Sequence, residues 1–541
     1  MEKFSKQITI LIVAIAVVIG VVFILKGNDI FDIFLSVVAL SVSAMPEGLP
    51  LALTLALTIG SNRMTKKNVI VKKLNSVESL GSCTVIASDK TGTLTVNEQT
   101  AKRIVLANGD VFEISGNGYN TNGKVTSLNK GRYEDAQYIS KLGFINNESV
   151  FEKNIDNKWT IMGDSIDVAF KVLAHKLESN INDIDVINKI QYESEKKFSA
   201  VFYNSDGKSR CTAKGSVEKI IEFCTHSYEN GKITKLDKEY ILHQNEDLAS
   251  KGYRVIAICD GNIQGNKYDE KNICNLCFIG LIGFIDPVRK EVENSIKECN
   301  AAGIKVIMIT GDHALTAYAI GKELKMVNCI QEVVTKDELD KYSLDNSAFD
   351  NFIKDKKVFA RVSPLDKLKI VESLQRQGEF VAVTGDGVND APAIKVANIG
   401  IAMGSGTDVA KETAKMIIID DNFTSIVSGI EEGRNAYSNI RKISILLLSC
   451  GLAEVFFYIM SVLFNLPIPL VAIQLLWLNL VTDGFQDIAL SFERETDVIM
   501  KNKPRKTKEG LFEKELLDQI LLSGIFMGVL VFVVWIMLLK V

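Results

Sequence analysis

Asp89 and the six residues after it form the pattern in this sequence most suited to chemistry. Residues 84–87 are a short apolar run that predicts a buried strand, and Asp89 stands at its carboxyl end, where open α/β sheets hold their ligands. A carboxylate there can attack a phosphoryl group and become an aspartyl phosphate if cations neutralise the transition state. Lys90 and the turn Thr91-Gly92-Thr93 add charge, hydroxyls and close main-chain amides. A lone Asp in a turn is usually only a cap, but the whole run predicts a nucleophile.

Three later strands end in polar residues of the same kind. Residues 305–309 lead to Thr310-Gly311-Asp312, residues 358–360 lead to Arg361, and residues 380–383 lead to the run from Thr384 to Asp390. Because strands of a doubly wound sheet deliver their loops to one edge, this convergence predicts an α/β domain with its site at that edge.

The run Asp-Lys-Thr-Gly-Thr-Leu-Thr at 89–95 resembles the phosphorylation motif of P-type ion-pumping ATPases. The resemblance implies a haloacid dehalogenase-like, doubly wound phosphorylation domain that uses ATP and Mg2+. Asp89 and Asp386, with Thr91, would hold Mg2+ through hard oxygens. Thr310 and Lys367 would hydrogen-bond and neutralise the transferred phosphoryl group. The implied catalytic residues are Asp89 as nucleophile, Lys367, Thr310, Asp312, Asp386, Asn389 and Asp390.

A mixed strand and helix region at 98–284 is predicted to be an inserted domain of the α+β type. Its Tyr192 is suited to stacking on adenine, and Lys197 and Lys214 are suited to binding phosphates. Taken singly, each is more often a surface residue, but the resemblance assigns this region to ATP binding. The implied ATP-binding residues are Tyr192, Lys197, Lys214, Gly215, Arg254, Thr91, Gly311 and Arg361.

One run in this region imitates a phosphate-binding loop. The spacing from Gly118 to Lys124 fits such a loop, but Val125 stands where a Ser or Thr is required. A polar hairpin turn is therefore the favoured interpretation.

Composition excludes a simple soluble domain. The chain has 541 residues, of which 47% are hydrophobic and 24% charged, with a mean hydropathy of +0.15. These values indicate membrane spans joined to a large polar part. A net charge of -4, without a basic stripe interleaved with aromatic residues, predicts no nucleic-acid partner. Nine cysteines, an odd number, indicate reduced thiols rather than a disulfide framework.

Five apolar runs are predicted to cross a bilayer, at 8–25, 30–59, 443–463, 470–490 and 520–539. The second is interrupted by Pro46-Glu47-Gly48-Leu49-Pro50, where two prolines remove main-chain donors, so we expect an unwound helix with free carbonyl oxygens. Arg63 and Lys66 follow this run and place its end in the cytoplasm by the positive-inside rule. The sequence thus predicts an integral membrane protein of a bacterial-type plasma membrane, with cytoplasmic catalytic domains.

Carboxylates within these runs indicate an ion site, because a charge at that depth costs about 3 kcal/mol on insertion scales. Asn479, Thr482 and Asp483 are spaced to share one helical face. The runs P-E-G-L-P and N-L-V-T-D-G resemble the calcium-pump branch (type IIA-like) of the P-type family. That resemblance implies one bound Ca2+ per cycle, because Gly451 replaces a ligand of the family's second site; Mn2+ stays open as an alternative ion. The implied ligands are Glu47, Asn479, Asp483 and the carbonyls of Val42, Ser43 and Met45, with Glu454 and Thr482 as further candidates.

The resemblance divides the chain into five segments. These are 1–66, two transmembrane helices; 67–97, phosphorylation domain; 98–284, nucleotide-binding domain; 285–435, phosphorylation domain again; and 436–541, three transmembrane helices. A typical pump is longer at both ends and has an actuator domain with a T-G-E-S loop, so we expect a partial or split pump working with a separate actuator-bearing chain. A haloacid dehalogenase-type phosphatase and a non-catalytic membrane remnant remain open as alternative functions.

Overall fold

The computed structural model describes residues 48–154, 159–179, 184–193, 195–205, 207–263, 267–342, 345–467, 469–494, 499–505 and 514–540, with the single residues 17, 31, 34, 38 and 41. The chain forms two compact units. The first consists of Met1–Ile86, Lys297–Lys305 and Leu374–Val541, and the second of Ala87–Ile296 and Val306–Ser373. The predicted span at 8–25, apart from Val17, and residues 30–47 of the next span, apart from Phe31, Phe34, Val38 and Ser41, lie outside the described residues.

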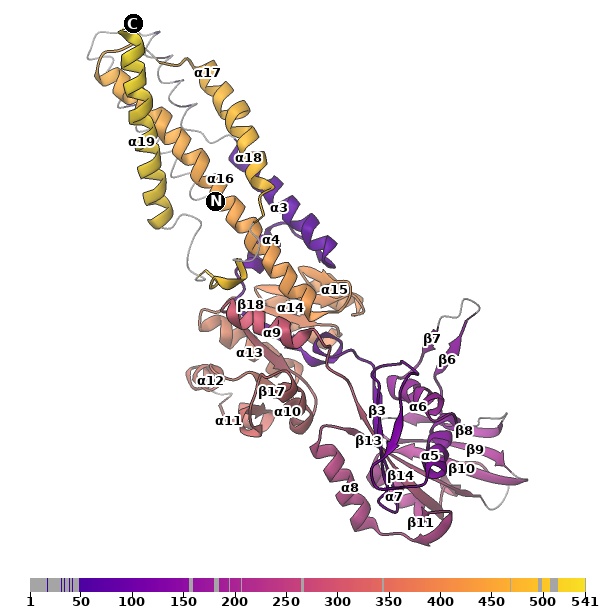
Figure 1. Ribbon diagram of the computed structural model, residues 1–541. Helices are drawn as coiled ribbons and strands as arrows, with labels where there is room; N and C mark the ends of the chain where they lie inside the picture. The colour runs from indigo at the N-terminus through magenta and orange to yellow at the C-terminus, as the bar shows by residue number, and fades with distance from the viewer. Residues whose placement is uncertain are drawn as a thin grey trace. The chain divides into compact units, whose positions relative to one another are not determined.

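Apolar helices make up much of the first unit (Figure 1). They are α3 (Leu49–Lys66), α16 (Phe423–Leu463), α17 (Ala472–Trp477), α18 (Asp483–Ser491) and α19 (Lys514–Leu539). In the described residues, α16 and α19 are the two helices long and apolar enough to cross a membrane. They run side by side, because a methyl group at Gly524 or Gly528 of α19 would come within 2.8 Å of Leu452 or Phe456 of α16. Such small residues let helices pack closely.

The other three predicted spans remain predictions. α3, of 18 residues, covers the end of the second one. The fourth, at 470–490, is not one regular helix, because the π-helical segment η5 (Leu478–Thr482) separates α17 from α18. A π-helical turn contains more residues than an α-helical turn, so it changes which residues share a face of the helix.

The first unit also contains one end of a mostly parallel β-sheet. Its strands β1 (Val69–Val71), β20 (Met416–Ile418), β19 (Ile399–Met403) and β18 (Val381–Gly385) lie in that order. β18, β19 and β20 are parallel and are connected by α14 (Ala391–Val396) and α15 (Asp408–Thr413), whereas β1 is antiparallel. Every residue of β18 and β19 is buried, as parallel strands require.

The start of β2 (Val85–Asp89) belongs to this unit too. The amide of Thr84 donates to the carbonyl of Phe380 at 2.9 Å, and the carbonyl of Thr84 accepts from the amide of Lys305 at 2.8 Å. Thr84 is followed by β2, Phe380 by β18, and Lys305 begins β15 (Lys305–Ile309). Three of the predicted strands therefore begin beside one another. α4 (Asn75–Gly81) precedes β2, and α9 (Val292–Ala301) precedes β15.

The second unit contains three further parallel strands in the order β15, β17 (Val358–Ala360) and β16 (Val333–Thr335). The helices α10 (Ala314–Glu323), α11 (Lys336–Tyr342), α12 (Asn346–Ile353) and α13 (Pro364–Arg376) alternate with these strands or follow them. This alternation is the predicted α/β pattern.

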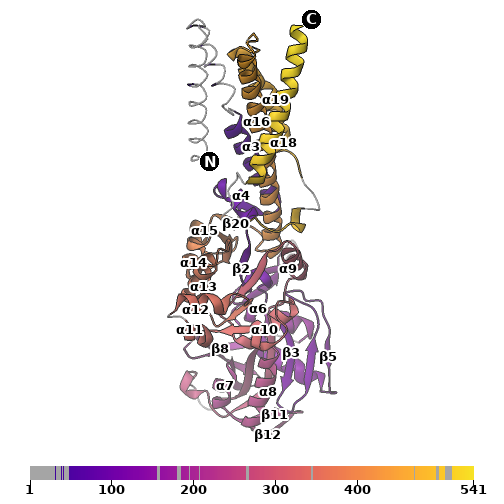
Figure 2. The same ribbon diagram turned by 90° about the vertical axis from the view of Figure 1, so that its left-hand side faces the viewer.

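The inserted region is a mainly antiparallel sheet with helices on both faces. Its strands are β5 (Val125–Ser127), β4 (Val111–Ile114), β3 (Thr100–Leu106), β14 (Leu276–Ile285), β13 (Arg254–Asn262), β10 (Lys208–Gly215), β9 (Phe198–Ser205) and β8 (Asp185–Glu193), in that spatial order, with β11 (Cys224–Glu229) pairing β14 and β12 (Lys232–Lys235). One buried cluster joins this sheet to α5 (Tyr133–Ile145) and α6 (Ser165–Lys176). Another joins it to α7 (Val217–Phe223) and α8 (Lys238–Ser250), which lie near β11 (Figure 2). A separate pair, β6 (Val150–Lys153) and β7 (Trp159–Met162), extends beyond the sheet.

Sulfur chemistry plays no structural part in either unit. All nine cysteines are free, as expected from their number. Packing and polar networks therefore hold the fold.

A buried polar network links four elements of the inserted region, α5, β9, β10 and β13. Asp260 of β13 is 1% exposed and accepts hydrogen bonds from the hydroxyls of Tyr138, at 2.8 Å, and Tyr203, at 2.9 Å. Arg210 of β10 forms an ion pair with the same carboxylate. Each group of the network is satisfied by another, so the loss of one partner leaves buried charge unpaired.

We expect Asp260→Ala to destabilise this region by about 3 to 5 kcal/mol, because it leaves the Arg210 guanidinium without its buried partner. Urea-dependent pulse proteolysis of the intact protein measures the change. The matched control is Asp247→Ala, which breaks an exposed pair with Lys251 and should cost less than about 1 kcal/mol. Equal effects of the two substitutions would contradict a structural role for the network.

Candidate active site

Asp89 is presented by a buried strand and faces a buried lysine. Val85, Ile86 and Ala87 of β2 are at most 1% exposed, and Asp89 ends the strand. The Nζ atom of Lys367, in the first turns of α13, lies 3.3 Å from Oδ2 of Asp89. The Lys367 side chain is 5% exposed and that of Asp89 is 26% exposed. The structure thus brings together the two residues predicted to be nucleophile and neutralising cation, although 278 positions separate them.

The turn after Asp89 is irregular. Thr91 has extended dihedral angles inside η1 (Lys90–Leu94), and Gly92 has a φ of 74°, which glycine adopts without strain. Lys90 is buried, with its Nζ atom 2.8 Å from Asp312 Oδ2 and 3.7 Å from Asp286 Oδ2. Two carboxylates therefore hold the charge of Lys90 in the turn that follows Asp89.

Asp286 is a site residue that the sequence analysis did not identify. Its carboxylate accepts hydrogen bonds from the Thr95 hydroxyl, at 2.5 Å, and from the Asn97 amide, at 2.8 Å. Burial raises the pKa of Asp286, and the Thr95 hydroxyl and the Lys90 ammonium oppose that rise. Asp286 follows the long apolar strand β14 just as Asp89 follows β2, and this signal could have revealed it.

The loops after β15 and β17 hold one another. The Thr310 hydroxyl accepts from the Asp312 amide at 3.1 Å, and the Arg361 amide donates to the Asp312 carbonyl at 2.9 Å. Arg361 has a φ of 54°, a conformation that is uncommon for a residue with a side chain. A methyl group built on Gly311 would meet no atom within 4 Å. The loop that carries Thr310 therefore leaves open space beside Gly311.

A cavity of about 530 Å³ in the second unit joins several predicted residues. It is lined by Lys90, Thr91 and Asp312 on one side and by Arg254 of β13 on another. Tyr253, His313 and Asp286 also line it, although the sequence analysis assigned them no role. Its volume is in the range of small-molecule pockets.

The remaining predicted ATP-binding residues form a separate group at neighbouring strand ends. Tyr192 lies at the end of β8 and is 55% exposed, Lys197 directly precedes β9, and Gly215 ends β10. A methyl group on Gly215 would lie 2.3 Å from the carbonyl oxygen of Lys197, so this close approach requires glycine. None of these residues lines the cavity described above.

Lys214 of this group is buried. It forms an ion pair with Asp167, donates to the carbonyl of Asn146, and stands 5.1 Å above the ring of Phe170. Burial lowers the pKa of the Lys214 ammonium, and the charge of Asp167 opposes that change. The structure therefore gives Lys214 protein partners as well as a place beside Gly215.

The predicted residues after β18 belong to the first unit. The Asp390 carboxylate accepts from the amides of Asp386, at 3.3 Å, and Gly387, at 3.1 Å. The Thr407 amide donates to the Asp386 carbonyl at 2.7 Å. Asp390 thus shapes the loop that presents Asp386, while the Asn389 side chain is exposed. Because Asp89 lies in the other unit, its sharing of Mg2+ with Asp386 stays a prediction.

The predicted membrane ligands are partly described. Asn479 and Asp483 are 7% and 8% exposed, but Thr482 is exposed. The π-helical turn of η5 explains why Thr482 departs from the face predicted for a regular α-helix. Glu454 is half-buried in α16. The other predicted ligands, Val42, Ser43, Met45 and Glu47, lie outside the described residues.

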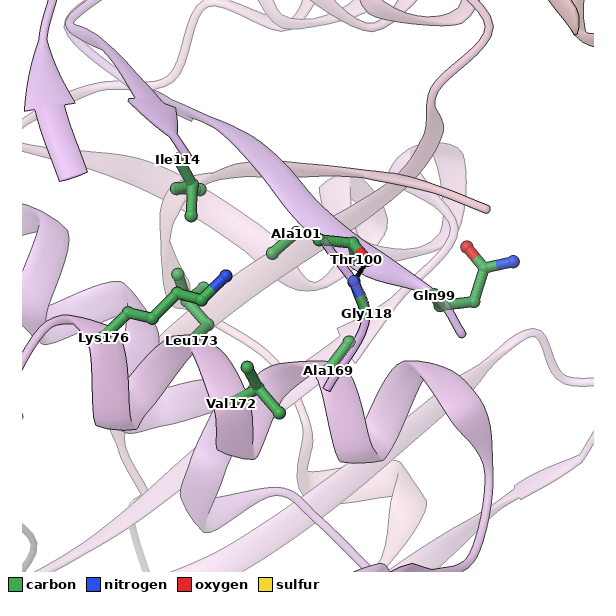
Figure 3. A pocket seen from close by; sticks show the side chains of 9 residues that line it. All are labelled: Gln99, Thr100, Ala101, Ile114, Gly118, Ala169, Val172, Leu173 and Lys176. Carbon is green, nitrogen blue, oxygen red and sulfur yellow. Dashed lines mark hydrogen bonds between the residues drawn. The ribbon is translucent and has the colours of Figure 1, made fainter. Parts of the chain in front are cut away.

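The run that imitates a phosphate loop has another structural role. Residues 115–124 connect β4 and β5, which pair as an antiparallel hairpin. Gly118 donates its amide to the Thr100 hydroxyl at 2.9 Å, in a recess closed by Lys176 and Leu173 (Figure 3). The recess leaves no room for a water molecule. The predicted hairpin is thus confirmed.

Comparison with known proteins finds related sequences along nearly the whole chain. Residues 136–291 match the family model for "P-type ATPase, cytoplasmic domain N", residues 367–430 that for "haloacid dehalogenase-like hydrolase", and residues 467–541 that for "Cation transporting ATPase, C-terminus". The chain is 38% identical to a calcium-transporting ATPase of Bacillus subtilis, over 98% of this chain and 61% of that protein. It is also 38% identical to the human calcium-transporting ATPase type 2C member 1, over 99% of this chain and 58% of that protein. The chain therefore spans about three-fifths of the length of these curated relatives.

Lys176 provides a pH-dependent test of the recess. Burial, and next the charge of Lys102, lowers the pKa of the Lys176 ammonium from 10.5 to about 8. Between these two values the folded state binds fewer protons than the unfolded state, so the free energy of unfolding should rise with pH. We expect a rise of about 1 to 3 kcal/mol between pH 8 and 10 relative to Lys176→Met, measured by urea-dependent pulse proteolysis. Lys208→Met, at an exposed position, is the control and should keep the rise; parallel curves for Lys176→Met and the unmodified protein would contradict the assignment.

Proposed function

The chain belongs to the P-type ATPase family, and from that premise we propose that Asp89 accepts the terminal phosphoryl group of ATP as one step of cation transport. The observation that supports this most directly is the 3.3 Å approach of the Lys367 ammonium to the Asp89 carboxylate at the end of a buried strand. A nucleophilic carboxylate needs a cation that also neutralises the incoming phosphoryl oxygens. We propose that Lys367 serves both purposes.

In the proposed step, an Asp89 oxygen forms a bond to the terminal phosphorus of ATP. The bond from that phosphorus to its bridging oxygen breaks, and ADP leaves with the electron pair. Lys367 stabilises the equatorial oxygens by charge, and the Thr310 hydroxyl donates a hydrogen bond to one of them. Lys90, held by Asp286 and Asp312, adds a second positive charge to the turn that follows the nucleophile.

Asp89, Thr91 and Asp386 are the residues that we propose to hold Mg2+. Their carboxylate and hydroxyl oxygens are hard ligands, and Mg2+ usually takes one or two carboxylates beside waters and phosphate. This donor chemistry fits the ion. When bound, Mg2+ would neutralise phosphate charge.

We assign the cavity between Lys90 and Arg254 to the triphosphate of ATP. It has polar groups from the nucleophile's own turn and a cationic side chain from the inserted region, and guanidinium groups bind phosphate in a bidentate way. Gly311 and Arg361 are proposed to border the phosphates. Tyr192, Lys197, Lys214 and Gly215 are proposed to bind ATP as well, with Tyr192 stacking on adenine.

The transported ion is proposed to be Ca2+, as the names of the curated relatives say of those proteins. Asn479 and Asp483 supply buried hard oxygens on neighbouring turns, and Glu47 with the carbonyls of Val42, Ser43 and Met45 completes the proposed ligand set. Glu454 and Thr482 are further candidates. The proposed location is a bacterial-type plasma membrane, with one Ca2+ carried in each cycle.

Labelling with γ-phosphate-labelled ATP tests the nucleophile. Membranes that contain the protein should yield an acid-stable, hydroxylamine-sensitive phosphoprotein, and Asp89→Asn should abolish it because the amide cannot attack phosphorus. Lys367→Met should lower the initial labelling rate by about 100-fold or more. Asp247→Asn, on the exposed face of α8, is the control. Undiminished labelling of Asp89→Asn would refute the proposal.

The cavity assignment predicts an effect on nucleotide affinity. Arg254→Ala should raise the ATP concentration for half-maximal labelling by about tenfold, since it removes charge-assisted hydrogen bonds to phosphate. Lys251→Ala removes a nearby cation that does not line the cavity and should leave that concentration unchanged. If both variants need the same ATP concentration as the unmodified protein, the triphosphate binds elsewhere.

A further inference from the structure

Asp487 of α18 is a buried carboxylate that neither the sequence analysis nor the proposed ligand set uses. Asp487 is 2% exposed. Among the residues that the structure describes, neither of its carboxylate oxygens has a hydrogen-bond partner. An ionisable group held in this way within a predicted membrane span is costly to bury and indicates a function.

The carboxylate lies where three helices meet. A methyl group built on Gly48, at the start of α3, would stand 2.7 Å from Oδ2 of Asp487 and 3.8 Å from Leu447 of α16. The carboxylate oxygen therefore lies directly against the main chain of Gly48. Any larger residue at position 48 would displace it, which gives a physical reason for the glycine in the P-E-G-L-P run.

Asp487 continues a polar stripe on one side of its helix. Asp483, four residues earlier, and Ser491, four residues later, are also buried, and this spacing puts all three on one face. The Ser491 hydroxyl donates to the Asp487 main-chain carbonyl at 2.8 Å, so it does not neutralise the carboxylate. The stripe begins directly after the π-helical segment η5.

A role in capping α3 does not account for this carboxylate. Negative charge at a helix start is favourable, and a capping side chain accepts a hydrogen bond from a free main-chain amide. Gly48 is the N-cap residue of α3, and Pro50, in the first turn, lacks an amide hydrogen. No side chain makes a capping hydrogen bond at this end of α3. Asp487 thus approaches α3 without making the contact that capping requires.

We propose that Asp487 is a ligand of the transported cation, acting one helical turn from Asp483. This inference rests on the proposed function and enlarges its ligand set. The described residues contain no group of three or more His, Cys, Asp or Glu side chains that could hold a metal. In the proposed site, Asp483 and Asp487 therefore supply two carboxylates, and other oxygens complete the coordination shell of the cation. A hard divalent cation such as Ca2+, which accepts carboxylate, carbonyl and water oxygens together, fits this set.

The test compares Asp487→Asn with Asp518→Asn in membranes that contain the protein. Asn keeps the shape of the side chain and removes its charge, and Asp518 is an exposed aspartate of α19 that serves as the matched control. The measurement is the Ca2+ concentration at which labelling of Asp89 by ATP is half-maximal. This midpoint does not depend on how much protein folds. We expect Asp487→Asn to raise it about tenfold or more, Asp487→Glu to raise it less, and Asp518→Asn to leave it unchanged.

The outcomes separate this inference from the proposed function. An unchanged midpoint in Asp487→Asn, with Ca2+-dependent labelling intact, overturns the ligand role of Asp487 alone. Labelling of Asp89 that needs no Ca2+ in the unmodified protein, with no equilibrium binding of labelled Ca2+, overturns both this role and the proposed ion, but leaves the nucleophile standing. Loss of labelling in Asp89→Asn is the separate criterion for the nucleophile.

Discussion

The approach of Lys367 to Asp89 is the interaction on which the candidate active site depends. A buried ammonium and a carboxylate 3.3 Å apart are costly to desolvate and stabilise each other only while their geometry holds. β2 fixes one partner, because its apolar residues are enclosed. The first turn of α13 fixes the other, where the Asp366 carboxylate accepts from the Ser363 amide at 3.0 Å and from the Ser363 hydroxyl at 2.6 Å.

The inserted region is joined to this pair by two chain segments that hold one another. The Val96 amide donates to the Pro287 carbonyl at 3.0 Å, and the Arg289 amide donates to the Leu94 carbonyl at 3.1 Å. The Arg289 guanidinium also donates to the carbonyls of Thr95 and Gly92. The entry and exit of the inserted region thus share one set of hydrogen bonds with the turn that follows the nucleophile. A change in that region has a direct physical route to Asp89.

The apolar helices of the first unit are informative in a different way. Exposed apolar side chains are expected on the predicted membrane spans, and the informative residues are the buried polar ones on η5 and α18. A carboxylate in such surroundings is stable only with a partner or a ligand. Asp487 has no hydrogen-bond partner among the described residues, and for this reason we propose it as an addition to the ligands that the sequence predicts on these two elements, Asn479, Thr482 and Asp483.

The sequence by itself determined the position of Asp89 and the α/β class, because both depend on local patterns: an apolar strand, a small polar turn, and the same order repeated at Thr310 and Asp386. It also determined the two longest apolar helices, α16 and α19, since length and hydropathy are enough for these. Only the tertiary structure decided which distant side chains meet. The ion pair of Lys214 with Asp167, the hydrogen bonds of Asp286 and the contact of Asp487 with Gly48 depend on packing between remote segments, and no local spacing encodes them. The exposed position of Thr482 was likewise beyond prediction, because the π-helical turn of η5 breaks the regular period on which face assignments rest.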